Sequence, residues 1–227
     1  MIRVEGLTVA YGAVKALVDV TFEAPTSAIT AVLGANGAGK TTLLRTISGL
    51  KAPLAGTITR DGTDLTSMKT EDIARLGIAH VPEGRGVIGE FTVEENLRLG
   101  ALTANVDTKQ GLASQYQRFP ILGERRRQHA DQLSGGERQI LSMARALIAK
   151  PSTLLLDEPS LGLAPLVTAQ IMATIKELCA SESLTVLLVE QNASSALRIA
   201  DYAVVLNVGH VVADDENLRQ YYLGMVR

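Results

Sequence analysis

The chain has 227 residues, of which 46% are hydrophobic, and a formal net charge of −2. Its length fits one large domain or a core with small inserted lobes. The near-balanced charge argues against binding to nucleic acid or anionic lipid, and the basic run 125–127 is interpreted as a solvated helix face. The single cysteine excludes an internal disulfide, as expected in a reducing compartment, and no apolar run reaches the roughly 18 residues needed to span a bilayer.

The first third of the chain predicts strands around a glycine-rich loop. Apolar residues alternate over 2–9 and 18–22, which predicts strands with one buried face. The apolar run 29–33 predicts a strand that leads into the loop, and a helix is expected from Thr41 to a C-cap at Gly49. Residues 57–60 and the turn Asp61-Gly62 predict a hairpin beside the N-terminal strands.

The rest of the chain predicts an α/β core with an insertion. Residues 78–81 form a short apolar strand, and the helical patterning of about 87–135 predicts an inserted helical lobe. Residues 154–156 and 184–189 resemble buried parallel strands, and the helical segment 165–180 between them makes a crossover. Residues 203–206 and 211–213 predict a hairpin, and a helix is expected at the C-terminus.

The glycine-rich loop carries the strongest motif. Residues 34–41 read GANGAGKT, which is G-x-x-x-x-G-K-T between a strand and a helix. Its glycines let the backbone N–H groups point at phosphate oxygens, Lys40 adds a charge toward the β- and γ-phosphates, and the Thr41 hydroxyl can ligate Mg²⁺. The residues expected to bind ATP here are Gly34, Asn36, Gly37, Ala38, Gly39, Lys40, Thr41 and Thr42.

Two acids follow the apolar run 154–156. Asp157 is expected to reach Mg²⁺, and Glu158 is expected to polarise the attacking water. Acids at a strand end often only cap a helix, so the pair alone is weak evidence for a catalytic site. Together with the phosphate-binding loop it becomes strong evidence.

A third motif, LSGGE at 133–137, opens a helix. Ser134 and Glu137 form a capping box, which an ordinary capped helix would also have. Gly135 and Gly136 each cost the first turn roughly 1 kcal/mol in helix propensity, and close approach of a phosphate would explain them. We therefore expect Ser134, Gly135 and Gly136 to form an anion site.

The order of these three motifs resembles the ATP-binding-cassette family over essentially the whole chain. The resemblance implies a P-loop NTPase (RecA-like) core, an N-terminal antiparallel β subdomain and an inserted α-helical subdomain. It also implies that two subunits pack head to tail, so that each ATP lies between one P-loop and the other chain's LSGGE. Tyr11 matches the aromatic residue that stacks on adenine, although a core tyrosine at a strand end is the alternative.

Three positions depart from the family pattern. Glu83 stands where a glutamine normally contacts Mg²⁺ and water, Gln191 replaces a histidine that contacts the γ-phosphate, and Ala164 replaces an aspartate that bridges subunits. Gln191 can still donate a hydrogen bond to phosphate. Glu83 brings negative charge near a phosphate unless Mg²⁺ or Arg85 offsets it.

The motifs VPEGRG, LSGGE, DEPSLGLAP and VEQN are similar to those of one ATPase subunit of bacterial branched-chain amino-acid importers. That resemblance implies a second, different ATPase subunit, two membrane permeases and a separate substrate-binding protein. It places the chain peripherally on the cytoplasmic face of the inner membrane, and a homodimer is possible in isolation. The alternatives are an amide or urea importer, a soluble ATPase of the same family, and a non-catalytic subunit.

Overall fold

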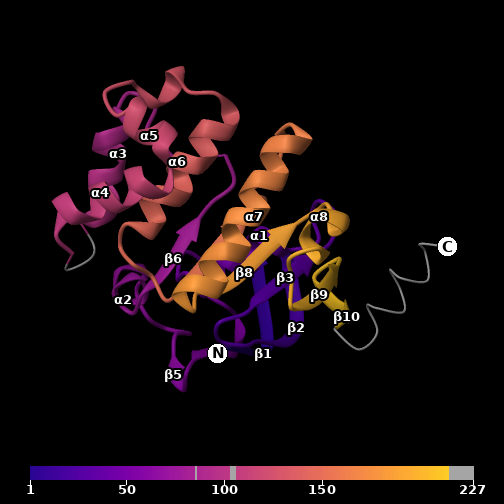
Figure 1. Cartoon of the computed structure of the whole chain (residues 1–227). Helices are drawn as coiled ribbons and strands as arrows, with labels where there is room; N and C mark the ends of the chain where they lie inside the picture. The colour runs from indigo at the N-terminus through magenta and orange to yellow at the C-terminus, as the bar shows by residue number, and fades with distance from the viewer. Residues whose placement is uncertain (85, 103–105, 215–227) are drawn as a thin grey trace.

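The computed structural model describes residues 1–84, 86–102 and 106–214, and contains two β-sheets (Figure 1). The first sheet is antiparallel with the order β2-β1-β4-β5. Its strands are β1 (Ile2–Tyr11), β2 (Val14–Ala24), β4 (Ala55–Arg60) and β5 (Thr63–Asp64). The predicted N-terminal strands and the hairpin at Asp61-Gly62 are confirmed.

The second sheet has the order β10-β9-β3-β8-β7-β6 and is parallel except for β10. Its strands are β3 (Ile29–Leu33), β6 (Ile78–Val81), β7 (Thr153–Asp157), β8 (Thr185–Glu190), β9 (Tyr202–Asn207) and β10 (His210–Ala213). Because β3 lies between β8 and β9, the loop that follows β3 leaves from the middle of the sheet, where α/β proteins bind ligands.

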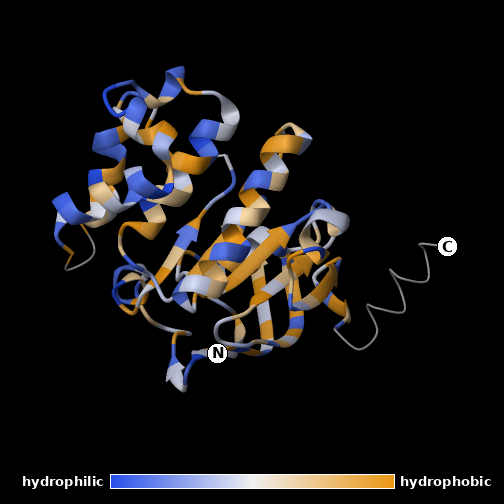
Figure 2. Ribbon diagram, in the orientation of Figure 1, coloured by the Kyte–Doolittle hydropathy of each residue, from blue (hydrophilic) through white to orange (hydrophobic). Residues whose placement is uncertain are grey.

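Both faces of the parallel sheet are covered. On β3 and β7, alternate residues such as Ile29, Leu33 and Leu156 enter one apolar cluster, while Val32 and Leu155 enter another. The second cluster joins the antiparallel sheet to helix α1 (Lys40–Ile47) and to Ile73 of helix α2 (Thr70–Arg75), and the first joins the remaining helices to the parallel sheet. The strands appear mostly orange between these layers in Figure 2.

The helices within the predicted insertion gather on one side of the molecule (Figure 1). They are α3 (Val93–Ala101), α4 (Thr108–Arg118), α5 (Pro120–Glu124) and the 3-10 helix η1 (Ala130–Gln132). Helix α6 (Gly135–Leu147) begins where the predicted insertion ends and packs against α3 and α5. Their buried side chains belong to the same apolar cluster as one face of the parallel sheet, so these helices share their core with it.

Three further helices complete the described chain, namely α2 (Thr70–Arg75), α7 (Pro165–Glu182) and α8 (Ala193–Leu197). The crossover β7-α7-β8 is the predicted one, whereas α2 and α8 were not predicted. Among the described helices, none has the length and apolar character needed to cross a membrane. The helix expected at the C-terminus lies outside the described residues.

Local backbone geometry explains several boundaries. Gly49 has φ 76°, and the N–H of Leu50 bonds to the Arg45 carbonyl at 2.8 Å, so the predicted C-cap glycine closes α1 in a Schellman motif. Asp61 and Gly62 both have positive φ, as a type I′ hairpin turn requires.

The basic run 125–127 lies in a turn after α5, so its interpretation as a helix face is wrong.

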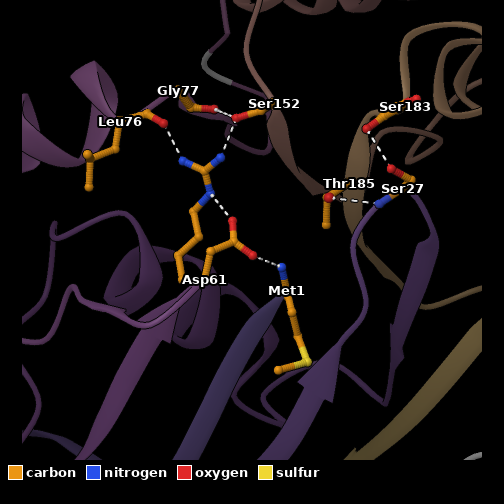
Figure 3. Close-up of polar contacts among 9 residues, drawn as sticks. Met1, Ser27, Asp61, Leu76, Gly77, Ser152, Ser183 and Thr185 are labelled. Carbon is orange, nitrogen blue, oxygen red and sulfur yellow. Dashed lines mark hydrogen bonds and ion pairs between the residues drawn. The ribbon is translucent and has the colours of Figure 1, made fainter.

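A polar cluster around Arg60, at the end of β4, ties the two sheets together near the amino ends of β6 and β7. Figure 3 labels its other members Met1, Asp61, Leu76, Gly77 and Ser152. The Arg60 guanidinium donates to the Leu76 carbonyl and to the Ser152 hydroxyl. It also lies 3.6 Å from the Asp61 carboxylate, which accepts from the N-terminal ammonium. The Arg60 side chain is 17% exposed, so these bonds are partly shielded from water.

We expect Arg60→Ala to lower the free energy of unfolding by about 1–3 kcal/mol, because it leaves the partners of a charged donor unsatisfied. The matched control is Arg75→Ala. Arg75 pairs with Asp72 at 2.8 Å but is 69% exposed, so its loss should cost less than about 1 kcal/mol. Urea unfolding of both variants checks this, and equal effects would contradict the role of the cluster.

Candidate nucleotide-binding site

The loop between β3 and α1 presents unpaired backbone donors. Helix α1 begins at Lys40 with no side-chain cap, and its N-cap residue Gly39 has φ 105°. Within the described residues, the N–H groups of Gly37 and Gly39 donate to no protein acceptor. A helix N-terminus with free N–H groups attracts anions, so the loop has the chemistry of a phosphate cradle.

Two of its glycines are required by close approaches of the chain. An ideal Cβ at Gly39 would lie 2.6 Å from both the Ala16 carbonyl oxygen and a methyl group of Leu17. One at Gly34 would lie 2.4 Å from the Leu206 carbonyl oxygen. Gly37, with φ 80°, has no atom within 4 Å of the same position. The loop is therefore wedged against β2 and β9 at Gly39 and Gly34 and is open at Gly37.

The packing around Gly39 and Gly37 predicts different effects of alanine on the stability of the protein without nucleotide. Gly39→Ala should lower the free energy of unfolding by about 3 kcal/mol, because strained backbone and a steric clash add together. Gly37→Ala, the matched control, meets only the backbone strain and should cost about 1 kcal/mol. Denaturant unfolding of both variants tests this, and a Gly37 variant as unstable as the Gly39 variant would contradict the packing described here.

The lysine of the loop is buried and fully bonded. Lys40 Nζ donates to the carbonyl oxygens of Gly34 at 2.8 Å and Ala35 at 3.1 Å, and it lies 3.1 Å from Glu158 Oε1. Lys40 is 4% exposed and the Glu158 side chain 9%. An ammonium has three donors, so phosphate must compete with Glu158 for one of them.

Asp157 lies directly beside the start of α1. Its Oδ1 accepts from the Thr41 hydroxyl at 3.2 Å, and its buried Oδ2 has no partner. Burial raises the pKa of Asp157, the Thr41 hydrogen bond opposes this, and the charges of Glu158 and Glu83 raise the pKa further. A hydroxyl, an orphaned carboxylate oxygen and neighbouring acids fit a hard cation such as Mg²⁺.

No group of three or more metal-ligating acids, histidines or cysteines occurs in the part of the chain that the structure describes. A Mg²⁺ ion at Thr41 and Asp157 would thus complete its shell with phosphate oxygens and water, as Mg²⁺ commonly does.

The loop, Glu83 and Glu158 line a cavity of about 300 Å³. Its lining includes Glu83, Glu158 and most of the loop residues expected to bind ATP; the loop residues are Asn36, Gly37, Gly39, Lys40, Thr41 and Thr42. Ala38 is buried beneath the loop, and Gln191 is exposed just after β8 without lining the cavity. Arg85 lies outside the described residues.

The predicted anion site at the start of α6 lies apart from this cavity. The capping box is confirmed, since Ser134 Oγ accepts from the Glu137 N–H at 3.3 Å and Glu137 accepts from the Ser134 N–H at 2.8 Å. A Cβ at Gly136 would lie 2.7 Å from Val167, whereas one at Gly135 would make only an ordinary contact. Packing against α7 therefore explains why residue 136 is a glycine. The expectation that close approach of a phosphate accounts for both glycines is incomplete.

Tyr11, at the end of β1, does not line the cavity either. Its side chain is 44% exposed, so the alternative of a core tyrosine is wrong. Lys51 Nζ lies 4.8 Å from the centroid of its ring, in a cation–π contact.

Sequence reasoning missed three residues around the site. Ala16 and Leu161 line the cavity. Glu190, the last residue of β8, is 2% exposed, and its Oε1 accepts from the Ser160 N–H at 3.1 Å. Burial raises the pKa of Glu190, and the charge of Glu158 adds to this. The signal was an acid ending an apolar strand, the pattern that identified Asp157.

In a comparison with known protein families, residues 17–161 match the family model described as ABC transporter. A high-affinity branched-chain amino acid transport ATP-binding protein of Pseudomonas aeruginosa is 43% identical, covering 99% of this chain and 100% of that protein. A probable branched-chain amino acid transport ATP-binding protein of Archaeoglobus fulgidus is 40% identical, covering 93% and 90%.

Among solved structures, a dimeric bacterial ABC transporter cassette superposes with a TM-score of 0.86 at 23% identity, covering 94% of this chain and 97% of that one. This similarity supports the fold: a P-loop core with an antiparallel sheet and inserted helices.

Proposed function

The chain belongs to the ABC transporter family, and from that premise we propose that it is the ATP-hydrolysing subunit of an importer for branched-chain amino acids. The observation that carries the proposal is the convergence of Lys40, Thr41 and Glu158 at one cavity beside a helix N-terminus, with Asp157 hydrogen-bonded to Thr41. The two curated relatives described above, at 43% and 40% identity, support the class of substrate.

In this proposal the loop binds the phosphates of ATP. The free N–H groups of Gly37 and Gly39 receive phosphate oxygens, and Lys40 turns from Glu158 toward the β- and γ-phosphates. Thr41 and Asp157 hold Mg²⁺, whose charge, when it is bound, offsets the charge that develops on the transferred phosphoryl group.

Glu158 is the proposed general base. Once phosphate occupies Lys40, the Glu158 carboxylate is released from its ion pair and can accept the proton of the attacking water. Glu83 lines the same cavity and is proposed to act on water or Mg²⁺ there. Gln191, exposed after β8, is proposed to donate to the γ-phosphate.

The adenine and the remaining phosphate contacts are assigned to surfaces outside the cavity. Tyr11 is half-exposed near the loop end of β1, and we assign its ring to stacking on adenine. Ser134, Gly135 and Gly136 do not line the cavity of their own chain, which supports a head-to-tail dimer in which a partner's equivalent segment closes each ATP site.

We propose that the working pair is a heterodimer, because Glu83, Gln191 and Ala164 stand where the family pattern has other residues. A second ATPase subunit with the usual residues would supply the other half of the site.

A second, larger cleft suits a membrane permease. It has a volume of about 1030 Å³ and lies between the α2-β6 region and the helices α3 and α6. Its charged lining consists of Arg75, Arg145 and Lys150. His80 also lines the cleft, and it is neutral at pH 7 because burial lowers its pKa to about 4. No acid of the described chain lines it, so a docking segment with a carboxylate would be favoured.

Two permeases would hold this chain on the cytoplasmic face of the inner membrane, and the amino acid itself would contact a separate binding protein. The test is affinity purification of the tagged chain from detergent-solubilised membranes of its own cells. We expect two membrane-spanning proteins and a second ATPase to co-purify, and Arg145→Glu to reduce their yield. Arg198→Glu, exposed near α8, is the matched control. Purification of the chain without any membrane protein would overturn the proposal.

A further inference from the structure

We propose that Glu190 is a positioning residue for ATP hydrolysis, which fixes the loop carrying Glu158. The inference rests on the proposed role of Glu158 as the base and extends it to a residue outside the phosphate-binding motifs.

Two successive hydrogen bonds join the end of β8 to the loop after β7. The Glu158 N–H donates to the Val189 carbonyl at 3.0 Å, and two residues later the Ser160 N–H donates to Glu190 Oε1 at 3.1 Å. The first bond extends the pairing of Asp157 with Val189 in the parallel sheet. The second is made by a side chain, so the identity of residue 190 decides whether the loop is held beyond the strand.

The held loop has an unfavourable backbone conformation. Glu158 has φ 46°, a left-handed value that costs a residue with a side chain on the order of 1 kcal/mol or more unless its surroundings enforce it. The bond from the Glu158 N–H to Val189 and the bond from the Ser160 N–H to Glu190 contribute to that enforcement, beside the local turn in which the Leu161 N–H donates to the Glu158 carbonyl at 3.1 Å. Without the Glu190 bond, the segment after Glu158 can relax, and the carboxylate that faces the cavity moves with it.

The chemistry of Glu190 favours this role over simple packing. A carboxylate that is 2% exposed and lies near another acid is costly to bury, and an apolar side chain at the end of this apolar strand would avoid that cost. Glu190 does not line the cavity, so it acts through the loop and touches neither phosphate nor water there.

The experiment compares Glu190→Leu with Glu190→Gln in the native assembly that contains this chain. Leucine removes the acceptor for the Ser160 N–H, whereas the amide of glutamine keeps one. We expect Glu190→Leu to lower kcat by about 10–100-fold with KM for ATP changed less than about threefold, because a small misplacement of a catalytic group costs this much. Glu190→Gln should retain kcat within about threefold of the parent. Ser160→Ala, which keeps the N–H, is the matched control and should behave as the parent.

Thermal melting and ADP affinity, measured on the same variants, separate positioning from folding. The inference is overturned if Glu190→Leu hydrolyses ATP like the parent, or if both Glu190 variants lose kcat, ADP affinity and stability together. Glu158→Gln is run alongside. If that variant alone keeps full activity, the proposed base is wrong; if it is inactive while Glu190→Leu is active, only the positioning role fails.

Discussion

Replacing Glu158 by glutamine is expected to reduce ATP hydrolysis at this site by at least about 100-fold, since removal of a general base commonly costs 10²–10⁴ in rate. The amide keeps the size of the side chain but cannot accept a proton from water. ATP affinity should stay or rise, because the ion pair between Lys40 and Glu158 no longer competes with phosphate. Steady-state hydrolysis by the native assembly and equilibrium ATP binding measure the two effects.

The matched control for that variant is Glu182→Gln. Glu182, at the end of α7, pairs with Arg118 and does not line the nucleotide cavity, so its replacement should leave hydrolysis unchanged. Two results together would show that this site regulates and does not hydrolyse ATP. The Glu158→Gln assembly would keep full ATPase activity, and the assembly would lose that activity when the partner ATPase loses the equivalent acid.

Replacing Lys40 by methionine is expected to weaken ATP binding by about 10–100-fold, because hydrogen bonds from a charged donor contribute about 1.5–3 kcal/mol each. Methionine can fill the apolar part of the space but supplies no charge for the phosphates. The same change leaves the Glu158 carboxylate, 9% exposed, without its cation. Titration calorimetry of the isolated chain with MgATP gives the affinity.

Lys150→Met is the control, since Lys150 lines the larger cleft and not the nucleotide cavity. An unchanged ATP affinity in a folded Lys40→Met variant would place the nucleotide elsewhere. Melting temperatures of both variants show whether a weaker affinity reflects binding or unfolding.

Short-range patterns allowed most of the fold to be predicted. The turn at Asp61-Gly62, the C-cap at Gly49 and the capping box at Ser134 each depend on residues within a few positions of one another, and all three are confirmed. The α/β class followed from apolar strands separated by a helix, and the structure has the same crossover.

Contacts between distant residues account for what sequence could not predict. The acidic partner of Lys40 in the structure is Glu158, and the neighbour that excludes a side chain at Gly136 is Val167, which comes from α7. Glu190 could have been identified from the sequence as an acid at the end of an apolar strand. Its hydrogen bond to Ser160 could not, because that bond depends on the pairing of β7 with β8. Such contacts follow from strand order, which short patterns do not specify.

We expect hydrolysis at the Glu158 site to drive import of branched-chain amino acids. The most direct test of this expectation is simultaneous measurement of leucine uptake and ATP consumption in vesicles containing the native assembly and its binding protein. We expect leucine to stimulate ATP consumption and to enter the vesicle, and we expect Glu158→Gln in this chain to abolish both the uptake and the stimulated ATP consumption. Leucine uptake that continues at the parent rate in the Glu158→Gln assembly would contradict this expectation.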